Sequence, residues 1–337
     1  MSISGFVVQP SALQECRAGA DLFSRPEIQA FLQRVASPDA AIAELAELVE
    51  GGDVFRGGMT AFLCGVMVER GASAPNAANA VLPVMRRYLH LARELVAQAG
   101  TEEEVFERSP DLVRAHHALP FVLLATMTIL SRDEQARKRM RADSEVVALV
   151  AELEERYETL YYVREVLALL DDQKILLLDP RNGRGFLFEL TGVRDVMYHF
   201  FALAQDALLR HAGPGYLGAE PTDPAAVRYA RNAGLTQQEF QDAGDLIDHQ
   251  RFGFHYPGAG DSPIPALFFP GSAAFSQIPV IDGCSTLFLT SRSIHAQWAP
   301  TNMYPVLHEA LEARVDLREL APEEVKARLA AFDRGGG

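Results

Sequence analysis

The chain has 337 residues, a net charge of −14, and a composition of 48% hydrophobic and 23% charged residues. This composition is typical of soluble globular proteins and excludes disordered and collagen-like chains. The length exceeds that at which one hydrophobic core usually stops growing, so two domains are expected. Residues 1–165 carry 17 Lys and Arg against 24 Asp and Glu, and residues 166–337 carry 14 against 21. Because both halves are acidic, we expect no binding to nucleic acid.

The cysteines and the apolar segments predict the compartment. The start of the chain lacks a basic segment followed by a long apolar stretch, so no secretory signal is predicted. The longest apolar stretch, Ala118–Leu130, contains a proline and is too short to span a bilayer. Cys16, Cys64 and Cys284 are few and widely separated, which indicates reduced thiols. Together these features predict a cytoplasmic protein without membrane association. Lysine is rare among the cationic residues, which indicates a GC-rich, bacterial-type genome.

Helix-patterned sequence fills the first 170 residues. Capping signals divide it: Ser24–Glu27 and Thr101–Glu104 have the spacing of capping boxes, and Ser37 and Ser109 each precede a proline. The pattern predicts seven or eight helices, arranged as a bundle or as an array of helical pairs. The clearest are expected, in chain order, after Ser37, over Met59–Glu69, over Asn76–Gln98, after Thr101, as a short helix after Ser109, over Phe121–Met140 and over Ser144–Leu170.

The helical pattern ends near residue 170. In the segment Lys174–Val193, two apolar runs rich in Leu and Phe flank a turn-forming stretch that contains Asn182-Gly183. An Asn-Gly pair between apolar runs favours a β-hairpin, because both residues tolerate a positive φ. The segment therefore predicts antiparallel strands and the start of a second domain.

The rest of the chain alternates helical and strand-like patterns. Helices are predicted over Val193–His211 and 222–232, and from Thr236 to about Gln250. Short strands separated by Pro and Gly are predicted near residues 252–290, including a pair around Asp282-Gly283. Two closing helices are predicted near Tyr304–Arg314 and Pro322–Phe332. The expected fold class is α+β, with an all-helical domain over residues 1–170 and a mixed domain over residues 171–337.

One group of residues has metal-ligand chemistry. Asp245 and His249 are four residues apart on a predicted helix, Asp248 lies beside them, and His255 follows on an extended segment. Two imidazoles and a carboxylate can hold Zn or Fe. The spacing matches no established metal-binding signature, and acidic residues are common on surface helices, so an ordinary solvated helix is the alternative.

A second group contains a candidate nucleophile. Cys284 follows a turn, and His295 and His308 lie downstream, so a thiolate activated by histidine is conceivable. The alternative is a small buried residue at the start of an apolar strand. The chain has no Gly-x-Ser-x-Gly elbow, no phosphate-binding glycine motif and no His-Glu-x-x-His motif.

Aromatic residues suggest a third kind of site. Tyr161, Tyr198 and His199 could line a cofactor or ligand pocket between the two halves, although ordinary core packing is the favoured explanation. His116 and His117 are neighbours on a predicted helix, where we expect one to be buried and the other exposed.

The sequence leaves three classes of function open. The first is a non-enzymatic protein that binds a protein partner as an adaptor, scaffold or regulatory subunit. The second is an enzyme that uses the metal or thiol residues on a small molecule or peptide, and the third is a small-molecule-binding regulator. The missing catalytic signature favours the first, which predicts an exposed apolar patch, with Met59–Met67 and Phe121–Ile129 as candidate segments. The sequence predicts no oligomeric state.

Overall fold

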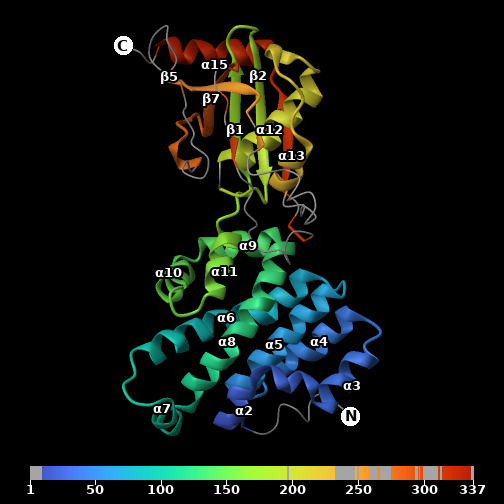
Figure 1. The fold of residues 1–337 in the computed structure, drawn as a ribbon, viewed down its shortest axis with the longest axis vertical. Coiled ribbons are helices and arrows are strands. Elements are labelled where there is room, and N and C mark those ends of the chain that lie inside the picture. Colours follow the sequence, from blue (N-terminus) through green and yellow to red (C-terminus); the bar gives the residue numbers. More distant parts are fainter. Residues whose placement is uncertain are drawn as a thin grey trace. The chain divides into compact units, whose positions relative to one another are not determined.

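The structure is a computed structural model that describes residues 10–195, 197–231, 247–248, 250–257, 264–265, 275–292, 295, 297–298, 310–311 and 313–334. The chain divides into two compact units, residues 1–167 and 168–337 (Figure 1). Helices form the first unit, and a sheet with helices forms the second, which confirms the predicted α+β class.

The described part of the N-terminal unit contains only helices. Long helices α5, α6 and α8 make most of its internal contacts and form its centre (Figure 1). The elements are α2 (Leu13–Ala18), η1 (Gly19–Ser24), α3 (Pro26–Arg34), α4 (Pro38–Val49), α5 (Val54–Glu69), α6 (Ala74–Val96), α7 (Glu102–Arg108), α8 (Pro110–Arg132), α9 (Glu134–Ala142), α10 (Ser144–Leu153) and α11 (Thr159–Leu167).

Two of the predicted helix starts are confirmed and one is wrong. The Ser37 hydroxyl accepts a hydrogen bond from the Ala40 N–H at the start of α4. Thr101 and Glu104 form both bonds of a capping box at the start of α7. Ser24 does not cap α3, because the capping position is occupied by Arg25, which makes no side-chain capping bond.

The predicted long helices differ from those observed. The helix that begins after Ser109 is not short: α8 runs for 23 residues and contains Pro120. It ends where Asp133 caps α9, and Asp143 caps α10 in the same way. The prediction over Phe121–Met140 is therefore wrong, because Asp133 caps a new helix inside it. The prediction over Ser144–Leu170 is also wrong, because α10 ends at Leu153 and α11 begins only at Thr159.

The C-terminal unit is built on one mixed sheet with the strand order β5-β4-β7-β1-β2-β9. A separate small pair joins β3 to β8. The strands are β1 (Gln173–Asp179), β2 (Arg184–Thr191), β3 (Ile247–Asp248), β4 (Phe252–Tyr256), β5 (Ile264–Pro265), β6 (Val280–Ile281), β7 (Cys284–Ser291), β8 (Gln297–Trp298) and β9 (Arg314–Glu319). The helical elements are α12 (Met197–Ala212), η2 (Tyr216–Gly218), α13 (Pro224–Ala230), η3 (Phe275–Gln277) and α15 (Pro322–Arg334).

The hairpin at the start of this unit is confirmed. Strands β1 and β2 pair antiparallel, with Asp179 opposite Arg184 beside the turn, and Gly183 has a φ of 62°. Strand β1 also pairs in parallel with β7, so the hairpin lies inside the sheet rather than at its edge. Burial on both faces explains the almost unbroken apolar run of β1.

Helices cover both faces of the sheet (Figure 1). One core joins the sheet to α12 and includes Phe188, Phe200 and Phe254. A smaller core on the other face joins Leu178 to Val325 of α15.

The segment Arg314–Glu319 forms edge strand β9, so the predicted helix near Tyr304–Arg314 does not extend to its predicted end. Residues 304–309, and the predicted helix from Thr236, lie outside the described residues.

A buried aspartate fixes the hairpin turn. Asp179 is fully buried, and its Oδ1 atom accepts hydrogen bonds from the backbone N–H groups of Arg181 and Asn182 at 3.1 Å. Its Oδ2 atom accepts from the Asn182 side chain at 2.7 Å and from the Tyr216 hydroxyl at 2.5 Å. Burial and the adjacent carboxylate raise the pKa of Tyr216, so its hydroxyl keeps the proton that it donates. The turn is therefore tied to the segment after α12.

One described helix, α8, has the length and apolar composition needed to cross a membrane. Of its most apolar window, 61% is buried inside the structure. The central helix of a soluble bundle has the same property, so the observation fits a soluble protein.

Candidate functional sites

Three phenylalanine rings meet on one side of the contact between α5 and α8. The centroids of Phe23 and Phe62 lie 4.8 Å apart, and each lies 5.8 Å from that of Phe121. Val66 and Leu124 lie one helical turn beyond Phe62 and Phe121, on α5 and α8. All five side chains are half-buried rather than enclosed in the core. We call this surface the aromatic face.

Glycines bring the two helices under the aromatic face unusually close together. A Cβ atom added at Gly65 of α5 would lie 2.8 Å from the Ala125 Cα atom of α8. One added at Gly58 would lie 2.7 Å from the Ala118 Cβ atom. Because no side chain fits between the backbones at these points, α5 and α8 form a tightly packed pair that holds the rings in place.

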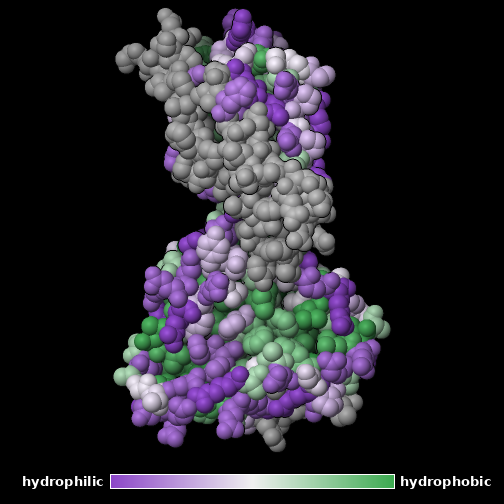
Figure 2. Space-filling view, viewed as in Figure 1, coloured by the Kyte–Doolittle hydropathy of each residue, from purple (hydrophilic) through white to green (hydrophobic). Residues whose placement is uncertain are grey.

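The surface view agrees with this arrangement. Figure 2 shows hydrophobic residues gathered over the middle of the N-terminal unit, where α5 and α8 lie in Figure 1. Contiguous apolar patches of several hundred Å² on soluble proteins often mark interaction sites. The predicted segments Met59–Met67 and Phe121–Ile129 are mostly buried, but each contributes residues to this face.

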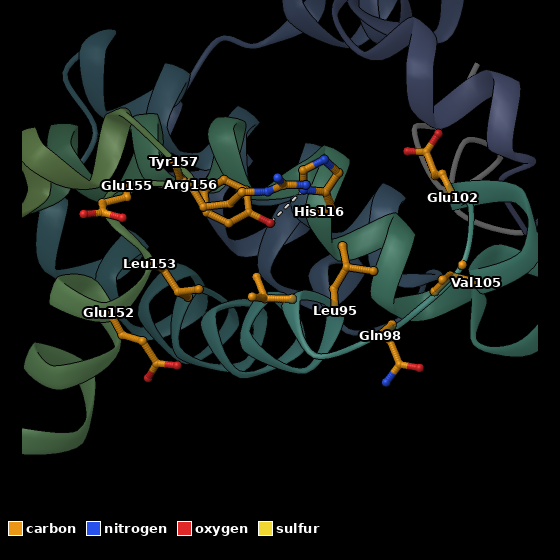
Figure 3. Close-up of a pocket in the computed structure, with 12 residues that line it drawn as sticks. Leu95, Gln98, Glu102, Val105, His116, Glu152, Leu153, Glu155, Arg156 and Tyr157 are labelled. Carbon is orange, nitrogen blue, oxygen red and sulfur yellow. Dashed lines mark hydrogen bonds between the residues drawn. The ribbon is translucent and has the colours of Figure 1, made fainter.

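A separate cleft of about 530 Å³ lies among α6, α7, α8 and the end of α10. Its apolar wall consists of Leu95, Val96, Val105 and Leu153. At its polar centre the His116 Nδ1 atom lies 2.7 Å from the Tyr157 hydroxyl. Figure 3 shows Arg156 and Tyr157 extending side by side toward His116, whereas Glu152 and Glu155 point away from it.

Burial controls the charge at this polar centre. Burial, His117 and Arg156 together lower the pKa of His116 below its usual 6.5, although Glu102 opposes the shift. Burial raises the pKa of Tyr157 to about 12, although Arg156 opposes the increase. Both groups are therefore uncharged at neutral pH and can exchange a hydrogen bond in either direction.

The neighbouring His117 belongs to a second network. Its Nε2 atom lies 2.7 Å from a Glu102 carboxylate oxygen, and Arg17 Nε donates to the same carboxylate at 2.7 Å. Burial alone would raise the pKa of Glu102, but these hydrogen bonds lower it. The ring centroids of His116 and His117 are 5.1 Å apart and both side chains are half-buried. The expectation of one buried and one exposed histidine is therefore wrong.

We expect His116 to titrate below pH 6.5, because the buried ring accepts a proton less readily than it does in the unfolded chain. As pH falls below 6.5 the unfolded chain binds this proton first, so acidification reduces the free energy of unfolding until the folded ring is also protonated. A pH titration of the His116 ring signal by NMR, assigned with His116→Gln, measures the midpoint. A midpoint at or above 6.5 would contradict the burial argument.

The structure does not bring the candidate nucleophile and its histidines together in the described residues. Cys284 begins β7 and packs against the apolar cluster under α15. His295 is exposed and forms a hydrogen bond with Arg292. His308 lies outside the described residues, so a Cys–His site stays a prediction.

The predicted metal site is described only in part. His255 lies on β4, where its Nδ1 atom is 3.4 Å from the Thr290 hydroxyl, and burial lowers its pKa. Asp248 is described as part of β3 without its side chain, and Asp245 and His249 lie outside the described residues. Among the residues that the structure describes, no group of three or more His, Cys, Asp or Glu side chains could hold a metal ion.

The predicted aromatic pocket residues lie in different units. Tyr161, on α11, is 40% exposed, and Arg164 lies over its ring at 5.2 Å. His199, on α12, is buried, with its ring centroid 5.2 Å from that of Tyr229. The side chain of Tyr198 is outside the described residues. A pocket that combines these residues stays a prediction.

Comparisons with models of protein families, with curated proteins and with solved structures gave no match for this chain. The described geometry defines a two-unit α+β protein with an aromatic face and a polar-centred cleft on its helical unit.

Proposed function

We propose that this protein acts by binding a protein partner on the aromatic face, as an adaptor, scaffold or regulatory subunit in the cytoplasm. The observation that carries the proposal is the half-buried group of three phenylalanine rings, Phe23, Phe62 and Phe121, in mutual contact. Aromatic residues are enriched at the centres of protein interfaces, where a few of them supply most of the binding energy.

The scaffold under the rings supports this proposal. Close packing at Gly58 and Gly65 fixes α5 against α8, so Phe62 and Phe121 do not need to be ordered when a partner binds. A preorganised surface loses less conformational entropy on binding than a mobile one. The net charge of −14 argues against nucleic acid as the partner.

The test is site-specific photo-crosslinking in the source cells. A photoreactive phenylalanine analogue at position 62 is expected to capture a protein, which is then purified and titrated with the intact chain. Phe121→Ser is expected to weaken that complex at least about tenfold, because it removes a ring from the centre of the interface. Val147→Ser is the matched control, since Val147 is an apolar residue of α10 that is 41% exposed.

Three results would overturn the proposal. Equal weakening by Val147→Ser would show that the aromatic face has no special role. Binding of the chain to phospholipid vesicles, lost in Phe121→Ser, would assign the face to a membrane surface. Concentration-dependent dimerisation that Phe121→Ser abolishes, measured by sedimentation velocity, would assign it to a second copy of this chain.

A further inference from the structure

The cleft on the helical unit has the size of a small-molecule site and lies apart from the three rings of the aromatic face. Its volume of about 530 Å³ is within the range of ligand pockets. Leu95, Val105 and Leu153 supply an apolar wall, and Val96 beside them is 59% exposed. An apolar ligand body could therefore replace water along one side of the cleft.

Hydrogen-bond donors converge on the opposite side. No described residue forms an ion pair or a side-chain hydrogen bond with Arg156, whose guanidinium group extends toward His116 (Figure 3). The His116 Nε2 atom also has no hydrogen-bond partner among the described residues, because the contact with Tyr157 uses Nδ1. When the Tyr157 hydroxyl donates to Nδ1, the neutral ring carries its proton on Nε2. Arg156 and His116, which both line the cleft, then both carry side-chain N–H groups that no described residue accepts.

We propose that this cleft binds a small carboxylate with an apolar body. The carboxylate accepts hydrogen bonds from the Arg156 guanidinium and from the His116 Nε2–H group. The bond with Arg156 is the stronger of the two, because both of its partners are charged. The apolar body lies against Leu95, Val96 and Leu153. Tyr157 is a positioning residue: when its hydroxyl donates to Nδ1, the proton of the neutral His116 ring is held on Nε2.

The acidic residues of the lining do not oppose this ligand strongly. The Glu102 carboxylate is already paired with Arg17 and His117. Glu152 and Glu155 are exposed and point away from the His116–Tyr157 pair (Figure 3). Exposed charges that face solvent are screened at physiological ionic strength. Arg156 is also exposed, but its side chain extends toward His116 (Figure 3).

The test uses three probes that share an alkyl chain and differ in their head group: hexanoate, hexylamine and hexanol. Binding of each to the full-length protein is measured by saturation-transfer NMR and by the shift of the His116 ring signal. We expect hexanoate to bind at millimolar concentration, at least about tenfold more tightly than hexylamine, because a charged carboxylate gains charge-assisted hydrogen bonds here.

Two neighbouring variants separate the charge of Arg156 from a general effect. Arg156→Gln is expected to weaken hexanoate binding about tenfold, because it removes the cationic donor. The matched control Glu155→Gln, one residue away, is expected to leave binding unchanged or slightly stronger. Tyr157→Phe is expected to weaken hexanoate severalfold and to alter the tautomer-sensitive ¹⁵N shifts of the His116 ring.

The proposal is overturned if hexylamine or hexanol binds as tightly as hexanoate. It is also overturned if hexanoate does not shift the His116 signal, or if Arg156→Gln and Glu155→Gln have equal effects. These outcomes do not depend on the aromatic face, so Phe121→Ser should bind hexanoate like the unsubstituted chain.

Discussion

Replacing Gly65 with valine should reduce the free energy of unfolding of the helical unit by about 3 kcal/mol. The new side chain would meet the Ala125 Cα and Cβ atoms at 2.8 and 2.9 Å, so the two helices would have to separate. The gain in helix propensity over glycine is smaller, at most about 1 kcal/mol. Urea denaturation followed by far-ultraviolet circular dichroism measures the change.

The matched control is Gly51→Ala, after α4. A Cβ atom there would lie 3.5 Å from the Glu47 carbonyl oxygen, which is an ordinary contact, and Gly51 is exposed. We expect a change within about 0.5 kcal/mol. If Gly65→Val is as well tolerated as the control, the close packing of α5 against α8 is not what stabilises the unit.

Removing the buried carboxylate in Asp179→Ala should destabilise the hairpin by about 3 kcal/mol. The substitution leaves the Tyr216 hydroxyl and the backbone N–H groups of Arg181 and Asn182 without their acceptor. A buried donor without an acceptor raises the free energy of the folded state, whereas water bonds to the same donor in the unfolded chain. Hydrogen exchange of peptides that cover β1 and β2 should show this loss of stability as faster exchange of their backbone amides.

A second turn of the same sheet provides the control. Asp282 lies in the turn between β6 and β7, is exposed, and accepts from Arg328 at 3.0 Å. Asp282→Asn keeps the side-chain shape and removes only a surface ion pair, so we expect a change within about 0.5 kcal/mol. Similar protection of β1 and β2 in Asp179→Ala and Asp282→Asn would contradict the role assigned to Asp179.

Local signals in the sequence predicted the local parts of the fold. Asn182-Gly183 predicted the hairpin because the turn conformation depends on those two residues and their apolar neighbours. Strand β9 was missed because its alternation of charged and apolar residues, RVDLRE, follows no turn signal. It becomes a strand by pairing with β2, which is far away in sequence.

The candidate sites were less predictable than the fold. The segments that contain Phe62 and Phe121 were predicted, but a helix that is apolar on most of its circumference does not indicate which side remains exposed. The His116–Tyr157 pair was missed because the two residues are 41 positions apart, and only the packing of the helices brings them together. His116 lies on α8 and Tyr157 in the connection between α10 and α11, so no common period in the sequence relates the two residues.

The parallel pairing of β1 with β7 limits how fast the second unit can be completed. Ile175 lies opposite Ser285, so about 110 residues must be synthesised after β1 before its central neighbour exists. At ordinary rates of translation this takes about 5 to 20 s. During that time both edges of the hairpin are unpaired, because β9, the partner of β2, follows β7 in the chain. Closing so long a loop is slow compared with forming helices or hairpins. The helical unit and the hairpin can therefore fold while the chain is still being made, and the sheet closes last.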